Sequence, residues 1–121
     1  MPSSKQKRGR QAEIQAKDYL EKLGYIFIEC NWHCRYGEID LIMMDGDELV
    51  FVEVKMRSDN KIAHPEEMVS HQKSMKLQKS GLEYLEEKEY ENFFWRFDII
   101  AITGNNLNYE IEHFKDTIRE D

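Results

Sequence analysis

The chain has few of the features that mark disulfide-stabilised, membrane-spanning or secreted proteins. It has only two cysteines, Cys30 and Cys34, so a disulfide framework is not its source of stability and both thiols are expected to be reduced. No apolar run approaches the roughly 20 residues that a helix needs to cross a bilayer, and the first residues lack the apolar block of a signal peptide. We therefore expect a cytoplasmic protein that does not enter a membrane.

Length and composition fit one globular domain. The 121 residues are enough for a single packed core but too few for two independent ones, and 40% of them are hydrophobic while 34% are charged. No internal repeat or linker interrupts the chain. We expect a flexible basic tail over residues 1–10, a single domain over residues 11–116 and a short tail over residues 117–121.

The net charge of −7 argues at first against a nucleic-acid ligand, because phosphate binding usually leaves a basic footprint. The charges are unevenly distributed, however. Residues 1–17 hold five basic side chains against one acid, and Lys73, Lys76 and Lys79 form a second basic group. Residues 83–91 hold five Glu against one Lys and are typical of a solvated surface. A localised basic face is therefore compatible with the acidic total.

Hydrophobic periodicity and turn residues predict alternating helices and strands. Gly24 supplies a helix stop, Asp45-Gly46-Asp47 is a strong hairpin signal, and Pro65 suits the first position of a second helix. The pattern predicts, in chain order, a helix over 11–23, a strand over 25–31, a loop over 32–36, strands over 37–44 and 48–55, a helix from Pro65 to about Glu89, and strands over 94–103 and 108–114. The apolar face of the second helix is expected to hold Met75, Leu77, Leu82, Tyr84 and Leu85.

The predicted hairpin carries two spaced pairs of charged residues. Side chains alternate between the faces of a strand, so Glu38 and Asp40 point the same way, and so do Glu53 and Lys55. The turn decides whether the two pairs share a face. A turn at Gly46-Asp47 sets Asp40 opposite Glu53, whereas a turn one residue earlier sets Glu38 opposite Glu53. Either turn, or a four-residue loop, gathers all four groups on one face with opposed Cβ atoms about 5 Å apart, whereas a three-residue loop without a bulge separates them.

Carboxylates gathered in this way repel one another unless they are protonated or neutralised, and a hard cation with oxygen ligands commonly neutralises them. We therefore predict a Mg²⁺ or Mn²⁺ site made by Glu38, Asp40 and Glu53, in preference to a solvated strand face. Glu13, at the border of the first helix, is either a further ligand or an exposed helix acid. Such an ion activates water for phosphodiester hydrolysis, and Lys55 would orient that water or stabilise charge on the phosphorus oxygens.

These residues also carry a family resemblance. Asp40, twelve residues and then Glu53-Val54-Lys55 resemble the D-(spacer)-E-x-K signature of restriction-endonuclease-like nucleases. More narrowly, three segments are similar to the YraN-like uncharacterised bacterial family, uncharacterised protein family 0102, which is distantly similar to archaeal Holliday-junction resolvases. The segments are Gly37 to Ile42, Val50 to Arg57 and Arg96 to Asp98, and the similarity runs from about Gly9 to Phe114.

The resemblance implies an α/β fold of restriction-endonuclease-like type, with a central mixed β-sheet flanked by helices in the order α-β-β-β-α-β-β. It lends Asp40 and Glu53 the roles of metal ligands and Lys55 that of catalytic lysine, and Glu38 belongs to the family motif. The chain departs from the family in having Ala12 where Gly is usual before the first-helix Glu, and Ala63-His64 where Phe-Gly is usual before the proline.

Several cations are candidates for contact with nucleic acid, and each has the alternative of being an ordinary surface residue. The candidates are Arg8, Arg10, His33, Arg35, Arg57, Lys73 and Lys76. Other conspicuous residues favour structural roles. Cys30, His33 and Cys34 lack a fourth zinc ligand at suitable spacing, Trp32 and Trp95 are expected in the core, and Asp98 is expected to be buried against Arg96 or the backbone.

The sequence thus favours a metal-dependent DNA endonuclease, that is, a hydrolase of phosphodiester bonds. A preference for branched or distorted DNA rests on the distant kinship alone. The main alternative is a nucleic-acid-binding protein of DNA repair or recombination that does not cut, and a protein-interaction domain would leave the acidic cluster without a purpose. A homodimer is in keeping with symmetric junction substrates, although the sequence identifies no dimer face.

Overall fold

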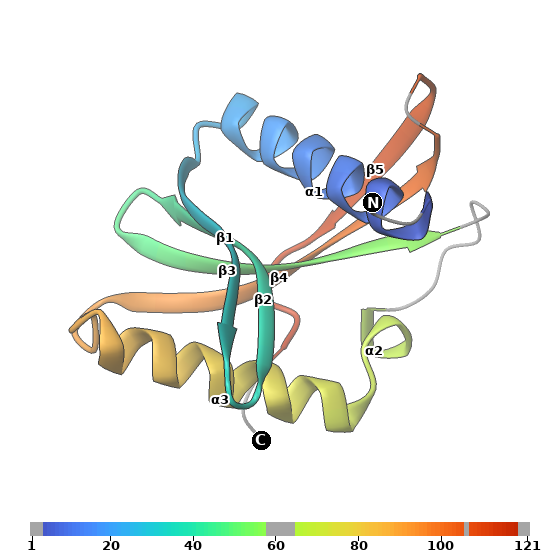
Figure 1. The fold of residues 1–121 in the computed structure, drawn as a ribbon. Helices are drawn as coiled ribbons and strands as arrows, with labels where there is room; N and C mark the ends of the chain where they lie inside the picture. The colour runs from blue at the N-terminus through green and yellow to red at the C-terminus, as the bar shows by residue number, and fades with distance from the viewer. Residues whose placement is uncertain (1–3, 58–64, 106, 119–121) are drawn as a thin grey trace.

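The computed structural model describes residues 4–57, 65–105 and 107–118, and it has a five-stranded sheet with one long helix against each face (Figure 1). The α/β class and the order of the main elements expected from the sequence are confirmed. The elements are α1 (Ser4–Lys22), β1 (Ile26–Cys34), β2 (Gly37–Asp45), β3 (Glu48–Arg57), α2 (Pro65–Met68), α3 (His71–Glu87), β4 (Phe94–Gly104) and β5 (Tyr109–Phe114).

The sheet is mixed, with strand order β1-β2-β3-β4-β5. Neighbouring strands are antiparallel except β3 and β4, which are parallel. A parallel pair needs a crossover connection, and α3 supplies it on the face opposite α1 (Figure 1). This is the restriction-endonuclease-like architecture that the resemblance implies. None of the helices in the described ranges has the length and apolar character needed to cross a membrane.

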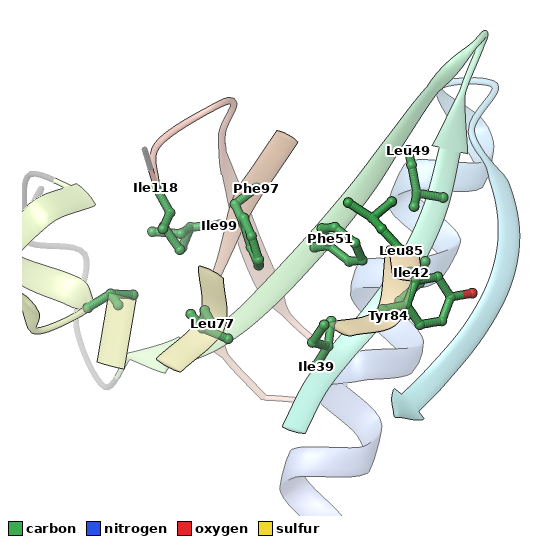
Figure 2. Packing of buried hydrophobic residues seen from close by; sticks show 11 residues of the cluster. Ile39, Ile42, Leu49, Phe51, Leu77, Tyr84, Leu85, Phe97, Ile99 and Ile118 are labelled. Atoms are coloured by element: carbon green, nitrogen blue, oxygen red, sulfur yellow. The ribbon is translucent and has the colours of Figure 1, made fainter. Parts of the chain in front are cut away.

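Two hydrophobic clusters join the helices to the sheet. On one face, Ala12, Ala16 and Leu20 of α1 pack on the valines of β3, and the small alanines allow a close approach. On the other face, Leu77 and Tyr84 of α3 pack on the inward aromatic rings of the sheet (Figure 2). Both faces of β3 are therefore buried, which explains its nearly continuous apolar run.

The helix α3 departs from its predicted form in two ways. The helix expected from Pro65 to Glu89 is broken at Val69 and Ser70, because Val69 is buried and Ser70 caps α3 by accepting a hydrogen bond from Lys73 N–H at 3.1 Å. The predicted apolar face is also partly wrong. Met75 and Leu82 are exposed, whereas Ser80 and Gly81 are buried because the rings of Phe51 and Phe97 lie against this turn of the helix.

The ordered structure at the two ends of the chain is longer than the predicted elements. The first helix begins at Ser4 instead of Gln11, so the start predicted for this helix is wrong, while residues 1–3 lie outside the described residues. The extra turns are held because Arg8 donates a hydrogen bond to the carbonyl oxygen of Gly104. At the other end, Thr117 N–H donates to Phe97 O at 3.0 Å and Ile118 is buried, so the domain includes both residues; residues 119–121 are not described.

The loop expected over residues 32–36 is instead part of a second hairpin. The strand β1 continues to Cys34 and pairs with β2, with Trp32 opposite Ile39 and only Arg35 and Tyr36 in the turn. Packing explains the difference, because the Trp32 ring meets the Tyr84 ring of α3 edge to face at 5.1 Å. The prediction that Trp32 and Trp95 belong to the core is confirmed, since both pack against the cluster on the α3 face.

The hairpin between β2 and β3 has the turn at Gly46 and Asp47, the first of the two predicted turns. Asp45 lies opposite Glu48, and the pairing continues to Leu41 opposite Val52. Gly46 has a φ of 62°, the left-handed conformation that this turn position requires. The register therefore carries Asp40 and Glu53 toward the end of the shared ladder.

Candidate functional site

The strands β2 and β3 separate just beyond Leu41 and Val52, and the candidate site lies at this fork. Beyond it, β2 remains paired with β1, and β3 remains paired with β4. Asp40 occupies the fork, where its Oδ2 accepts a hydrogen bond from the backbone N–H of Val54 at 2.8 Å. A side-chain carboxylate thus takes the place of a strand partner. The sheet opens here without leaving this N–H unsatisfied.

Glu53 lies beside Asp40 and is the more deeply buried of the two acids. Only 6% of the residue is exposed, and its carboxyl group hydrogen-bonds to Asp40. Its Oε2 atom is buried and has no hydrogen-bond donor among the described residues. The Nζ atom of Lys73, from the first turn of α3, is 3.7 Å from this oxygen. A buried carboxylate oxygen without a hydrogen bond destabilises the folded state, so Glu53 is an electrostatically unfavourable residue in this part of the sheet.

The surroundings of Glu53 raise its pKa well above the usual range of a glutamate. Burial is the largest cause, followed by the hydrogen bond and the charge of Asp40, whereas the cations Lys73 and Lys55 lower the pKa. The protonated form is therefore favoured when only protein groups surround it. A cation placed between the two carboxylates would displace this proton and neutralise the repulsion.

Glu13, from α1, extends the acidic group on the other side of Asp40. Burial and the nearby charge of Asp40 raise the pKa of Glu13, and a hydrogen bond with the side chain of Asn31 opposes that shift. Glu38 is farther out, half-exposed, with its Oε1 atom 3.7 Å from His33 Nε2. The structure therefore brings Asp40 and Glu53 together and sets Glu13 near both Asp40 and Glu38, whose charges each raise the pKa of Glu13.

The acidic group offers an ion two close carboxylates and not a complete cage. Within residues 4–57, 65–105 and 107–118, no three His, Cys, Asp or Glu side chains lie close enough to hold a metal ion. Mg²⁺ and Mn²⁺ suit such a site, since Mg²⁺ commonly binds one or two carboxylates and completes its shell with water and phosphate oxygens. The unsatisfied Glu53 Oε2 atom and the hard oxygen donors fit that chemistry.

Cations lie on both sides of the acids. On the α3 side, Lys73 and Lys76 line a cavity of ≈ 180 Å³ together with Glu38, in the angle between α3 and the tip of the β1–β2 hairpin. On the α1 side, Arg10 lines a second cavity of ≈ 220 Å³ together with Glu13. The candidate site is thus acidic in the middle and basic at each end.

The remaining predicted contact residues are engaged elsewhere. The guanidinium of Arg57 is mostly buried and pairs with Glu112 of β5 at 2.5 Å. Arg35 lies 3.7 Å from Glu83 and stacks on Tyr36, at the tip of the β1–β2 hairpin. His33 is beside Glu38 and Arg8 is bound to Gly104, as described above. Of the seven predicted cations, Lys73, Lys76 and Arg10 are the ones that line cavities containing an acid of the candidate group.

Two participants were not predicted in their actual roles. Lys73 was a candidate for phosphate contact, but its closeness to Glu53 depends on how α3 docks, which spacing along the chain does not reveal. Asn31 was missed altogether. It has a φ of 52° within β1, and asparagine tolerates this left-handed conformation better than most residues. The feature of the sequence that could have indicated this role is the asparagine itself, at the last position of the strand predicted over 25–31.

A second buried charged cluster lies on the α1 face of the sheet. Asp98 is fully buried, and its carboxylate is bound by Arg96 Nε at 2.9 Å, His113 Nε2 at 2.8 Å and Asp116 N–H at 3.0 Å. Arg96 also pairs with Glu48 and contacts Asp45 at 3.1 Å. The prediction that Asp98 is buried against Arg96 is confirmed, and the part played by His113 was not foreseen. This cluster is satisfied by its own partners, unlike Glu53.

Comparison with known proteins places the chain in one family. The family model described as Uncharacterised protein family UPF0102 matches residues 12–102. A UPF0102 protein of Syntrophus aciditrophicus is 42% identical over 108 residues, covering 89% of this chain and 85% of its own length. UPF0102 proteins of Clostridium tetani and Nitrosomonas eutropha are each 40% identical, covering 98% of this chain and 99% and 98% of their own lengths. The matched region contains every acid of the candidate site, and the chain belongs to the uncharacterised protein family UPF0102.

Proposed function

We propose that this protein is a metal-dependent DNA endonuclease that hydrolyses phosphodiester bonds at the fork between β2 and β3. The observation that carries the proposal is the pair Asp40 and Glu53, in which a buried carboxylate oxygen has no hydrogen-bond donor among the described residues but lies 3.7 Å from a lysine ammonium. A structural acid would be expected to be satisfied, as Asp98 is. An acid pair held ready for a cation, with lysines beside it, suits chemistry on a phosphate.

The side chains divide the work between binding the cation and binding the substrate. Asp40 and Glu53 would hold Mg²⁺ or Mn²⁺, with Glu13 and Glu38 reached through water because they stand farther out. Such an ion, when bound, polarises a phosphoryl oxygen and lowers the pKa of an attacking water. Lys55 and Lys73, the two cations that act on Glu53, would orient the phosphate and stabilise charge on its oxygens.

The ends of the site suit the flanking phosphates of a DNA strand. Arg10 on one side and Lys73 and Lys76 on the other would take phosphates before and after the cleaved bond. The proposal also includes a preference for branched DNA, a homodimer matched to a symmetric junction, and action in the cytoplasm. The preference for branched DNA rests on the distant kinship to junction resolvases.

A second candidate is a protein of DNA repair or recombination that binds DNA without cutting it. The observation that favours it is the lack, within the described part of the chain, of three ligands close enough to enclose an ion. The same cations would then bind phosphate, and the acids would select against wrongly placed phosphates by repulsion. The two candidates differ in whether the protein takes up metal by itself.

The test is a cleavage assay with the purified protein on linear, single-stranded and four-way-junction DNA, with Mg²⁺, Mn²⁺ or EDTA. Asp40→Asn and Glu53→Gln remove one ligand charge each, and Asp47→Asn removes an exposed charge at the hairpin turn as the matched control. We expect cleavage with either metal, none with EDTA, and at least a 100-fold loss in the two site variants, about 2.7 kcal/mol of transition-state stabilisation. The control should cut as the wild type does.

Two results would overturn the endonuclease proposal. One is no cleavage of any DNA by the wild type with either metal, and the other is equal cleavage by wild type and Asp40→Asn. A calorimetric titration with Mn²⁺ then separates the candidates. Heat of binding in the wild type that is lost in Glu53→Gln supports the nuclease, whereas DNA binding with no manganese binding supports the non-cutting protein.

A further inference from the structure

A cavity of ≈ 220 Å³ lies between α1 and the β1–β2 hairpin, and Leu41, the residue after Asp40, is part of its lining. Glu13 lines the cavity and also acts electrostatically on Asp40, so the cavity and the candidate site share a wall. The other residues of its lining are Arg10, Ile14, Lys17, Cys30, Asn31 and Leu41.

The alternation of side chains along β1 is broken beside the cavity. Residues two apart in a strand normally face the same side, yet Cys30 lines this cavity on the α1 side and Trp32 packs into the cluster on the α3 side. Asn31 lies between them with its φ of 52°, and its side chain hydrogen-bonds to Glu13. Left-handed backbone in a residue other than glycine costs free energy, and such positions concentrate at functional sites. Asn31 therefore both lines the cavity and holds an acid of the site.

The lining of the cavity combines aliphatic side chains with charged ones. Ile14 and Leu41 supply aliphatic walls, and Ile14 is 58% exposed although it is a large apolar residue beside a charged site. Arg10 supplies a cation. The volume is smaller than the roughly 300–1,000 Å³ of pockets for drug-sized ligands, and so fits a single ring system. A flat ring linked to phosphates has the matching chemistry.

We propose that this cavity receives one unpaired nucleobase of the DNA strand whose phosphate lies at Asp40 and Glu53. The inference rests on the proposed function, and it adds the reason for selecting a substrate. A paired base must first be unstacked and unpaired to enter, whereas a bulged, mismatched or single-stranded base enters at less cost. Contacts between the base and the apolar walls would then hold it. The site therefore selects DNA with at least one unpaired nucleotide next to the cleaved bond.

The experiment compares binding to two duplexes of the same sequence, one fully paired and one with a single bulged 2-aminopurine, in EDTA so that no cleavage occurs. The wild type should bind the bulged duplex about tenfold more tightly, because the aliphatic walls contact the extruded base and an unpaired base costs little to extrude. Ile14→Gln removes an apolar wall and should reduce the preference to less than about threefold. Ile26→Gln is the matched control, because Ile26 is similarly exposed, at 66%, and does not line the cavity. A second variant, Cys30→Phe, fills the cavity and should abolish the preference.

Equal binding of the two duplexes by the wild type would overturn the nucleobase site, as would a preference that survives both Ile14→Gln and Cys30→Phe. Cleavage of the same duplexes with Mn²⁺ keeps this failure distinct from failure of the endonuclease. Cutting without preference refutes only the nucleobase site, and a bulge preference without cutting refutes only the endonuclease. A wild type that shows no preference for the bulged duplex in EDTA and cuts neither duplex with Mn²⁺ refutes both.

Discussion

Two buried acids on neighbouring strands of this sheet differ in whether hydrogen-bond donors satisfy their carboxylates. Asp98 lies opposite Val52 in the pairing of β4 with β3, and Glu53 is the next residue along β3. Asp98 faces α1 and is bound by a guanidinium, an imidazole and a backbone N–H. Glu53 faces the opposite side, hydrogen-bonds to another acid, and has one oxygen with no donor among the described residues.

The pKa values of the two acids express this difference. Burial raises the pKa of both, but hydrogen bonds from His113, Arg96 and Asp116 N–H outweigh it and hold the pKa of Asp98 below its ordinary value. At Glu53, Asp40 adds to the effect of burial and the pKa is raised. A buried acid with all its partners supports the fold, whereas one that lacks partners marks a place where something else binds.

The largest expected effect is the loss of the satisfied acid. Asp98→Asn removes the charge that Arg96 faces while keeping the shape of the side chain, and Arg96 has only 9% of its side chain exposed. We expect the free energy of unfolding to fall by about 3 kcal/mol, because removing one partner of a buried pair leaves the other uncompensated. Urea unfolding followed by tryptophan fluorescence measures it.

The control for this variant is Glu48→Gln, which removes another partner of Arg96 from a position that is one-third exposed. Exposed pairs are screened by solvent, so the expected cost is less than about 1 kcal/mol. The structural role of Asp98 would be contradicted if the two substitutions cost the same.

Glu53→Gln should affect metal binding and leave stability nearly unchanged, the reverse of what is expected for Asp98→Asn. The uncharged amide removes the repulsion with Asp40, so the free energy of unfolding in EDTA should stay within about 1 kcal/mol of the wild type or rise. Affinity for Mn²⁺, measured by calorimetry, should fall by about 10- to 100-fold, which is ~1.4–2.8 kcal/mol. Clear destabilisation in EDTA with unchanged manganese affinity would make Glu53 a structural acid like Asp98.

The dependence of stability on pH should have opposite signs for the two acids. Asp98 has a folded pKa below the ordinary 3.8, so its contribution is fully present above 3.8 and is lost as the pH falls through the folded value. Glu53 has a folded pKa above the ordinary 4.5, so the folded state binds its proton more tightly and stability declines as the pH rises from 4.5 to the folded value.

A tenfold difference in proton affinity between the folded and unfolded states corresponds to about 1.4 kcal/mol of stability. Unfolding in EDTA from acidic to neutral pH should therefore show Glu53→Gln gaining stability relative to the wild type above pH 4.5. Asp98→Asn should approach the wild type below pH 3.8. Parallel curves for wild type and Glu53→Gln would mean that Glu53 has an ordinary pKa in the folded state.

Sequence reasoning found Asp40 and Glu53 because their positions depend on local rules. Strand alternation and the turn at Gly46 and Asp47 determine the register of one hairpin, and the register brings the two acids to the same place. The buried role of Asp98 was also predictable, since an acid within an apolar run needs a partner and Arg96 is two residues away on the same face of β4.

What the sequence did not reveal depends on contacts between distant segments. The extent of α1 depends on Arg8 reaching Gly104, and the second hairpin depends on Trp32 meeting Tyr84 across the fold. The place of Glu38 in the acidic group stays a prediction, although its charge acts on Glu13 and it lines a cavity with Lys73. Since β2 leaves β3 at Asp40, the two-residue rule no longer relates Glu38 to Glu53 beyond that point.

Lys73 allows the most sensitive test of the difference between Asp98 and Glu53, because its ammonium is the cation closest to being an ion-pair partner of Glu53. Its ammonium lies 3.7 Å from Glu53 Oε2 but is 43% exposed, so solvent and salt weaken the attraction. Lys73→Met should raise the pKa of Glu53 by less than about 1, as followed by NMR of its carboxyl carbon, and Lys76→Met, one turn farther along α3, should leave it unchanged. The rise should shrink in high salt if the effect is electrostatic. A much larger rise in the pKa would instead mean that Lys73 satisfies Glu53 as Arg96 satisfies Asp98, and the contrast between the two acids would disappear.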